Sequence, residues 1–159
     1  MKRAFFLDTG DKPGLLVSLM RFFAGSAHIA LEGNQDDMSG MNFETIPGFK
    51  EGLVGPFDSE WSSDRNRFIV LPLETETIPL IMSEILPEGR VIHKVGAIQI
   101  EKNGEIQFLA GHHFYRECAS VGPGAPEQLL KSLVASGILR AYYSTQDGTE
   151  EIIRKMSGR

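Results

Sequence analysis

The segment from Asp8 to Leu16, "DTGDKPGLL", has the residue types of a loop that binds an anion. Gly14 lets another molecule approach the backbone closely, and Pro13 suits the first turn of a helix. The free N–H groups at the start of that helix could face a carboxylate. Glu32 and Asn34 end a second predicted strand and could accept hydrogen bonds from an amine at the same sheet edge. The alternative is a tight turn whose glycines serve only the backbone geometry.

Residues 34–66 form a second candidate site, because charge and aromatic side chains occur there together. Seven acidic and two basic residues give this segment a net charge of −5, which is the formal charge of the whole chain. Acidic charge with interleaved aromatic residues suits a surface for a basic protein partner. The residues selected for that contact are Phe49, Phe57, Asp58 and Trp61. The alternative is a loop that folds its aromatic residues over one end of the sheet.

The stretch "GHHFYREC" is a third candidate, because His112, His113, Glu117 and Cys118 are residue types that bind metals or form a thiol–imidazole pair. In a strand, however, the two histidines point to opposite faces and do not easily chelate one ion. A single cysteine near histidines is also weak evidence for a nucleophile. We therefore assign no catalytic residue, metal ion or cofactor, and the sequence leans towards a protein that is not an enzyme.

Hydrophobic periodicity predicts the elements that must position these residues. Predicted strands cover residues 4–7, 27–33, 67–74 and 91–101, and predicted helices cover 15–23 and the residues after Thr77. The first strand–helix–strand unit indicates two adjacent parallel strands with a right-handed crossover. His93 alternates with apolar residues, which predicts a half-buried position in a strand. No regular period is found in residues 34–66, and long segments of this kind are usually functional loops or disordered.

The last third of the chain is predicted to add a hairpin, a helix that begins at Pro126, and further short strands. For the hairpin "EKNGEI", a three-residue turn pairs Ile100 with Ile106 and Ile98 with Phe108. That register places four large apolar side chains on one face, so we prefer it to a two-residue turn, with Gly104 in the left-handed conformation. The helix positions expected against one sheet are Leu16, Leu19, Phe23, Ile78, Ile81, Ile85, Leu130 and Leu133.

Length and composition limit the class of protein. A chain of 159 residues with 42% hydrophobic residues is long enough for one domain with a real core. The net charge of −5 argues against a nucleic-acid partner, and no apolar run approaches the ~20 residues of a membrane span. One cysteine allows no internal disulfide bond, and a cytoplasmic location is the default expectation.

Two stretches of the first 34 residues resemble the start of an ACT domain, a small-molecule-sensing βαββαβ module. These stretches are "DKPGLL" (Asp11 to Leu16) and "FFAGSAHIALEGN" (Phe22 to Asn34). They are closest to the type of ACT domain found in prephenate dehydratases. The resemblance implies a ferredoxin-like fold, a homodimer, and an amino acid framed by Asp11, Gly14 and Leu15.

The sequence therefore predicts a single α+β domain over residues 1–159. Its parts are a ferredoxin-like βαββαβ core, an insertion at 34–66 and a C-terminal hairpin–helix extension at 102–159. The leading functional hypothesis is a non-catalytic regulatory module that binds a small anionic metabolite, such as an amino acid, at the first strand–helix loop. The predicted ligand-binding residues are Asp11, Gly14, Leu15, Glu32 and Asn34. The alternative is a protein-interaction or inhibitor protein, such as a toxin-neutralising factor, that acts through the insertion.

Overall fold

The computed structural model describes residues 2–57, 65–111, 119–148, 151–152 and 154–155. Within them, the chain is α+β, with one eight-stranded sheet in the order β3-β4-β2-β5-β6-β7-β1-β8 and antiparallel neighbours throughout. The strands are β1 (Phe5–Thr9), β2 (Ala27–Asn34), β3 (Lys50–Glu51), β4 (Asn66–Leu73), β5 (Ala97–Lys102), β6 (Glu105–Ala110), β7 (Ala119–Val121) and β8 (Leu139–Ser144). The helices are α1 (Lys12–Phe23), α2 (Gln35–Met38), α3 (Ile78–Ile85) and α4 (Glu127–Ala135), with short 3₁₀ turns η1 (Phe43–Thr45), η2 (Pro87–Gly89) and η5 (Thr145–Asp147).

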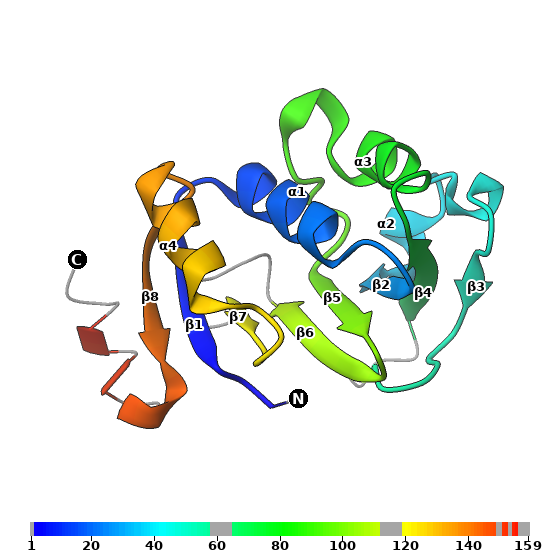
Figure 1. Ribbon diagram of the computed structural model, residues 1–159. Coiled ribbons are helices and arrows are strands. Elements are labelled where there is room, and N and C mark those ends of the chain that lie inside the picture. Colours follow the sequence, from blue (N-terminus) through cyan, green and yellow to red (C-terminus); the bar gives the residue numbers. More distant parts are fainter. Residues whose placement is uncertain (1, 58–64, 112–118, 149–150, 153, 156–159) are drawn as a thin grey trace.

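The longer helices α1, α3 and α4 cover one face of the sheet (Figure 1). Their apolar stripes pack on the strand residues of that face and form the main core with them. All eight helix positions predicted from periodicity are buried in this core: Leu16, Leu19, Phe23, Ile78, Ile81, Ile85, Leu130 and Leu133. Spacing at i, i+3 and i+4 was sufficient to identify these faces, because it depends only on the geometry of a single helix.

The strand order differs from the prediction. Strands β1 and β2 are not adjacent, since β5, β6 and β7 lie between them in the sheet. Instead, β1 pairs with β7 and β8, while β2 pairs with β4 and β5. The prediction of an adjacent parallel pair is therefore wrong, and a ferredoxin-like βαββαβ core is not confirmed. Local patterns define the elements, but the partners of β1 come from the far end of the chain.

The β5–β6 hairpin differs from the prediction in turn and in register, since Ile100 pairs with Phe108 and Ile98 with Ala110. Its turn has two residues, Asn103 and Gly104, both with positive φ, at 56° and 81°. The predicted left-handed conformation of Gly104 is confirmed, but the three-residue turn is wrong. A bulge between Ile100 and Glu101 shifts the register so that Ile100 faces Phe108. The bulge buries both side chains in the main core despite the short turn.

The predicted strand 91–101 is also shorter than expected. Residues 91–96 form loop and turn, and only Ala97 onward belongs to β5. His93 lies exposed in this turn, so its predicted half-buried strand position is wrong. The turn places the backbone carbonyl of Lys94 close to Gly33 of β2, where any Cβ atom would come within 2.3 Å of it. Gly33 is therefore required for the close packing of this end of the sheet.

Candidate functional site

In the first strand–helix loop, a side chain of the loop itself already binds the backbone N–H group that was predicted to bind a ligand. Asp11 is the N-cap of α1, and its Oδ1 accepts a hydrogen bond from the Gly14 N–H at 2.9 Å. The Leu15 N–H donates to the backbone carbonyl of Asp11 at 3.0 Å, and the Leu15 side chain is fully buried. A ligand carboxylate would have to displace the Asp11 carboxylate to reach the N–H of Gly14. The loop has the geometry of a capped helix start.

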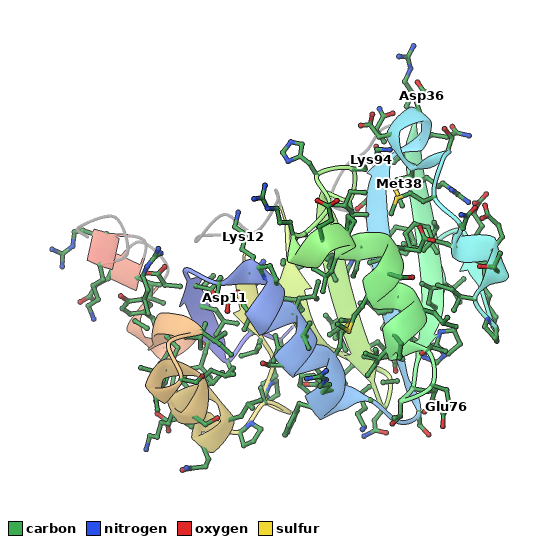
Figure 2. All side chains as sticks on the ribbon, turned by 90° about the horizontal axis from the view of Figure 1, so that it is seen from above. Asp11, Lys12, Asp36, Met38, Glu76 and Lys94 are labelled. Atoms are coloured by element: carbon green, nitrogen blue, oxygen red, sulfur yellow. The ribbon has the colours of Figure 1, made fainter. Side chains whose placement is uncertain are left out.

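Glu32 and Asn34, the other two predicted ligand-binding residues, belong to a different part of the sheet. With β5, β6 and β7 between them, β1 and β2 are about 19 Å apart at the usual strand spacing. Figure 2 shows Asp11 at the start of α1, well separated from Met38 and Lys94 at the end of the sheet that holds α2. Asn34 caps α2, since its Oδ1 accepts from the Asp36 N–H at 2.9 Å. The structure therefore does not bring the five residues together.

The insertion at 34–66 is built into the fold. Four of its apolar side chains lie in the main core: Met38, Met41, Phe43 and Ile46. Of these, Met38 and Phe43 are completely buried. The segment also adds β3 to one edge of the sheet, next to β4 (Figure 1). The described residues of the insertion are thus held by packing on the main core and by strand pairing. The absence of a regular period in residues 34–66 did not indicate this packing.

The aromatic residues of the insertion that can be placed point inward. Phe49 is partly buried against the main core. Phe57 is 4% exposed and packs on the opposite face of the sheet in a second cluster, where its ring centroid lies 6.3 Å from that of Phe68. These two residues follow the alternative interpretation, in which aromatic side chains cover the sheet. Asp58 and Trp61, the other predicted partner-binding residues, lie outside the described residues.

Arg67 of β4 ties the insertion to the sheet, and each of its three guanidinium nitrogens donates a hydrogen bond. Nε donates to Glu51 Oε1 at 2.7 Å, and Nη2 donates to Glu44 Oε1 at 2.5 Å. Nη1 donates to the backbone carbonyl of Met38 at 2.9 Å. One buried cation therefore fixes three separate points of the insertion: the end of α2, η1 and β3.

The ionisation of this cluster follows from these contacts. Burial alone would lower the pKa of Arg67, but the hydrogen bonds to Glu51 and Glu44 outweigh it and raise that pKa above its usual value. A backbone hydrogen bond at Glu44, together with the bond from Arg67, lowers the pKa of the Glu44 carboxyl. Both shifts widen the pH range over which Glu44 and Arg67 are charged together.

The insertion presents its described acids to solvent, although Glu44 and Glu51 are also bound by Arg67. The four acidic residues of the insertion that the structure describes are all exposed: Asp36, Asp37, Glu44 and Glu51. Two large apolar side chains lie on the same segment, Leu53 at 56% exposure and Val54 at 43%. Protein interfaces commonly combine an apolar centre with a polar rim. We call these six exposed residues of the insertion the acidic face; Lys50 and Arg65, the two basic residues of the insertion, are exposed as well.

A hollow of about 330 Å³ lies beside β3 at this end of the sheet. Glu32, Glu51, Leu53 and Arg67 are among the residues that line it. Glu32 is 1% exposed, and its Oε2 accepts a hydrogen bond from Asn66 Nδ2 at 3.1 Å. A smaller hollow of about 260 Å³ adjoins it across Asn66, and Asn34 and His93 are among its lining residues. Glu32 and Asn34, two of the predicted ligand-binding residues, thus line hollows at this end of the sheet and not at the first strand–helix loop.

The third predicted candidate is the stretch "GHHFYREC". His112, His113, Glu117 and Cys118 fall in residues 112–118, outside the described part of the chain. Among the residues that are described, no group of three or more histidine, cysteine or acidic side chains is arranged to hold a metal ion. No helix in the described ranges is long and apolar enough to cross a membrane.

Arg67 and its two carboxylates are the structural anchor that sequence reasoning missed. The only signal was a basic residue at the start of an apolar strand, "RFIVLPLE", after a segment rich in acids. That pattern does not reveal which acids approach the arginine, because Glu44 and Glu51 are brought to it by the fold of the insertion.

No family model, curated protein or solved structure matches this chain.

Proposed function

We propose that this chain is a non-catalytic protein-interaction module, a binder or inhibitor of a basic protein, which acts through the acidic face. One observation carries the proposal: the insertion buries its methionine and aromatic side chains and exposes its carboxylates on an anchored backbone. An anchored surface loses less conformational entropy on binding than a mobile loop, and so retains more of its contact energy. Its negative charge favours the approach and orientation of a basic partner.

The first strand–helix loop gives less support to the sensing of a small anionic metabolite. Its amide donors at Gly14 and Leu15 already have acceptors within the loop. Of the two nearby carboxylates, Asp11 caps the helix, and Asp8 is fully buried and paired with Arg140 at 3.3 Å. Amino-acid sensing there remains a hypothesis that a calorimetric titration with amino acids would test.

The proposal is tested by comparative capture from extracts of the source cells. Two double variants are immobilised beside the wild type: Asp36→Lys with Asp37→Lys on the acidic face, and Glu76→Lys with Glu88→Lys as the control. All four residues are exposed, and each pair raises the formal net charge of −5 by the same amount. Figure 2 places Glu76 far from Asp36.

We expect the wild type and the control to retain a basic protein, identified by mass spectrometry, that the Asp36 and Asp37 variant does not retain. Equal loss of the protein in both double variants would show that net charge, and not the acidic face, attracts it, and equal retention by all three proteins would show that neither does. If no basic protein is enriched by the wild type, the proposed function is wrong. A circular dichroism spectrum of each variant, recorded before the capture experiment, checks that its fold is that of the wild type.

A further inference from the structure

A groove lies between α1 and α3, which are side by side on the helical side of the sheet (Figure 2). Its volume is about 740 Å³, within the range of pockets that hold small molecules. Most of its lining residues are apolar: Ala24, Ile78, Pro79, Met82 and Leu86. The groove therefore offers an apolar surface of the size of a small ligand.

The helix α3 is more apolar than a helix that only covers one face of a sheet. Its sequence, "IPLIMSEI", has two polar residues, Ser83 and Glu84. The three isoleucines are buried, yet Pro79 is exposed and Met82 is only partly buried, and both of these line the groove. A helix that is apolar on several faces is normally covered on each of them. The groove side of α3 is apolar and is left open by the described residues.

Arg21, in the last turn of α1, is the one charged residue that lines the groove. A cation at this position commonly serves the carbonyl groups at the C-terminal end of a helix. Here that role is filled by Lys102 of β5, whose Nζ donates to the carbonyls of Phe23 and Ala24 at 3.1 and 3.4 Å. The Arg21 side chain makes no hydrogen bond or ion pair with another described residue. Its guanidinium is therefore available to a ligand in the groove.

We propose that this groove binds a small apolar carboxylic acid, with its chain against α3 and its carboxylate on Arg21. A guanidinium presents two parallel N–H donors to a carboxylate. The apolar lining removes the chain of the ligand from water, and the single cation selects a single negative charge. The flexible side chain of Met82 can adapt to the shape of the chain. The inference goes beyond the proposed function and does not rest on it, because none of the acidic-face residues lines the groove.

The test is an NMR titration of the whole ¹⁵N-labelled chain with three probes. Hexanoate has the apolar chain and the charge, hexanamide has the chain without the charge, and acetate has the charge without the chain. We expect saturable shifts of the amides of Ala24, Thr75 and Ser83 with hexanoate at concentrations up to about 20 mM, and weaker binding of the other two probes. No saturable shift with hexanoate, or equal binding of hexanamide or acetate, would overturn the proposal.

A single variant connects the binding to the cation. We expect Arg21→Gln to weaken binding of hexanoate by about threefold or more, and to leave binding of hexanamide unchanged. The matched control is Arg154→Gln, since Arg154 is an exposed arginine that does not line the groove. Equal affinity for hexanoate in the wild type and Arg21→Gln would contradict the assignment. The comparison of the three probes uses only the wild type, and so remains decisive if Arg21→Gln does not fold.

Other outcomes identify a different occupant or separate the two proposals. If the amides of the groove shift with the concentration of the protein alone, a second copy covers the groove and the ligand proposal is wrong. If hexanoate does not bind while the Asp36 and Asp37 variant still loses the basic partner, this inference fails and the proposed function stands. If hexanoate binds but no charge-dependent partner is captured, the carboxylate site stands and the protein-interaction function fails.

Discussion

Arg67 provides the sharpest test of how the insertion is held. Its side chain is 10% exposed and donates to Met38, Glu44 and Glu51, which lie in three different parts of the insertion. We expect Arg67→Gln to destabilise the protein, because the shorter neutral side chain cannot reach these acceptors together. The variant also leaves the carboxylates of Glu44 and Glu51 without their shared cation.

The expected loss can be worked out contact by contact. A hydrogen bond from a charged donor contributes about 1.5–3 kcal/mol, which applies to the Met38 carbonyl. The ion pair with Glu51, whose side chain is 57% exposed, adds about 0.2–1 kcal/mol after solvent screening. We therefore expect Arg67→Gln to lower the free energy of unfolding by about 2–4 kcal/mol. That is a large part of the stability of about 5–15 kcal/mol that is typical of a domain.

Urea unfolding followed by circular dichroism measures the free energy of unfolding. Amide hydrogen exchange over residues 38–52 measures the local stability of the insertion. The control is Arg90→Gln, an exposed residue after η2. We expect Arg67→Gln to speed exchange in the insertion more than in α1 or α4, and Arg90→Gln to have little effect. A change below about 0.5 kcal/mol, with exchange in the insertion unchanged, would refute the claim that Arg67 anchors this segment.

Three further predictions follow from other parts of the structure. Ile81→Ala should lower the free energy of unfolding in urea by about 2–5 kcal/mol, because Ile81 is fully buried. The control is Leu80→Ala, since the neighbouring Leu80 is 44% exposed. An equal loss of unfolding free energy in both variants would contradict the packing of α3. Gly14→Val should lower the melting temperature, because a Cβ atom would lie 2.2 Å from the carboxylate that caps α1; an unchanged melting temperature would show that this cap is not needed. The lowered pKa of Glu44 means that its contribution to stability is complete above its unfolded value of 4.5 and is lost as the pH falls through the lower folded value. The difference in unfolding free energy between wild type and Glu44→Gln should therefore shrink below pH 4.5, and a constant difference would count against the Arg67 contact.

Local sequence patterns predicted the parts of the fold that depend on one element at a time. The buried faces of α1, α3 and α4 follow from helical spacing, and the positive φ of Gly104 follows from turn chemistry. The register of the hairpin did not follow, because it depends on a bulge beside Ile100 that buries Phe108. The prediction assumed a regular ladder, in which burial of these side chains required a three-residue turn, whereas the bulge buries them beside a two-residue turn.

The strand order could not be predicted from the same patterns. Strands β1 and β2 are separated by only one helix in the chain, yet β1 lies between β7 and β8 in the sheet. The deciding contacts, such as Phe5 opposite Val121 and Ser144, join residues more than 100 positions apart. No local period contains that information, and the same is true of the approach of Glu44 and Glu51 to Arg67. The position of the acidic charge in the chain was visible, but its anchoring was not.

The central claim is that the acidic face binds a basic protein, and a calorimetric titration tests it most directly. The captured basic protein is purified and titrated into the wild type, the Asp36→Lys and Asp37→Lys variant, and the Glu76→Lys and Glu88→Lys control at two salt concentrations. We expect salt to weaken binding to the wild type, and charge reversal at Asp36 and Asp37 to weaken it by about tenfold or more, while the control binds as the wild type does. Binding that is independent of salt and equal in all three proteins would show that the acidic face does not bind the partner.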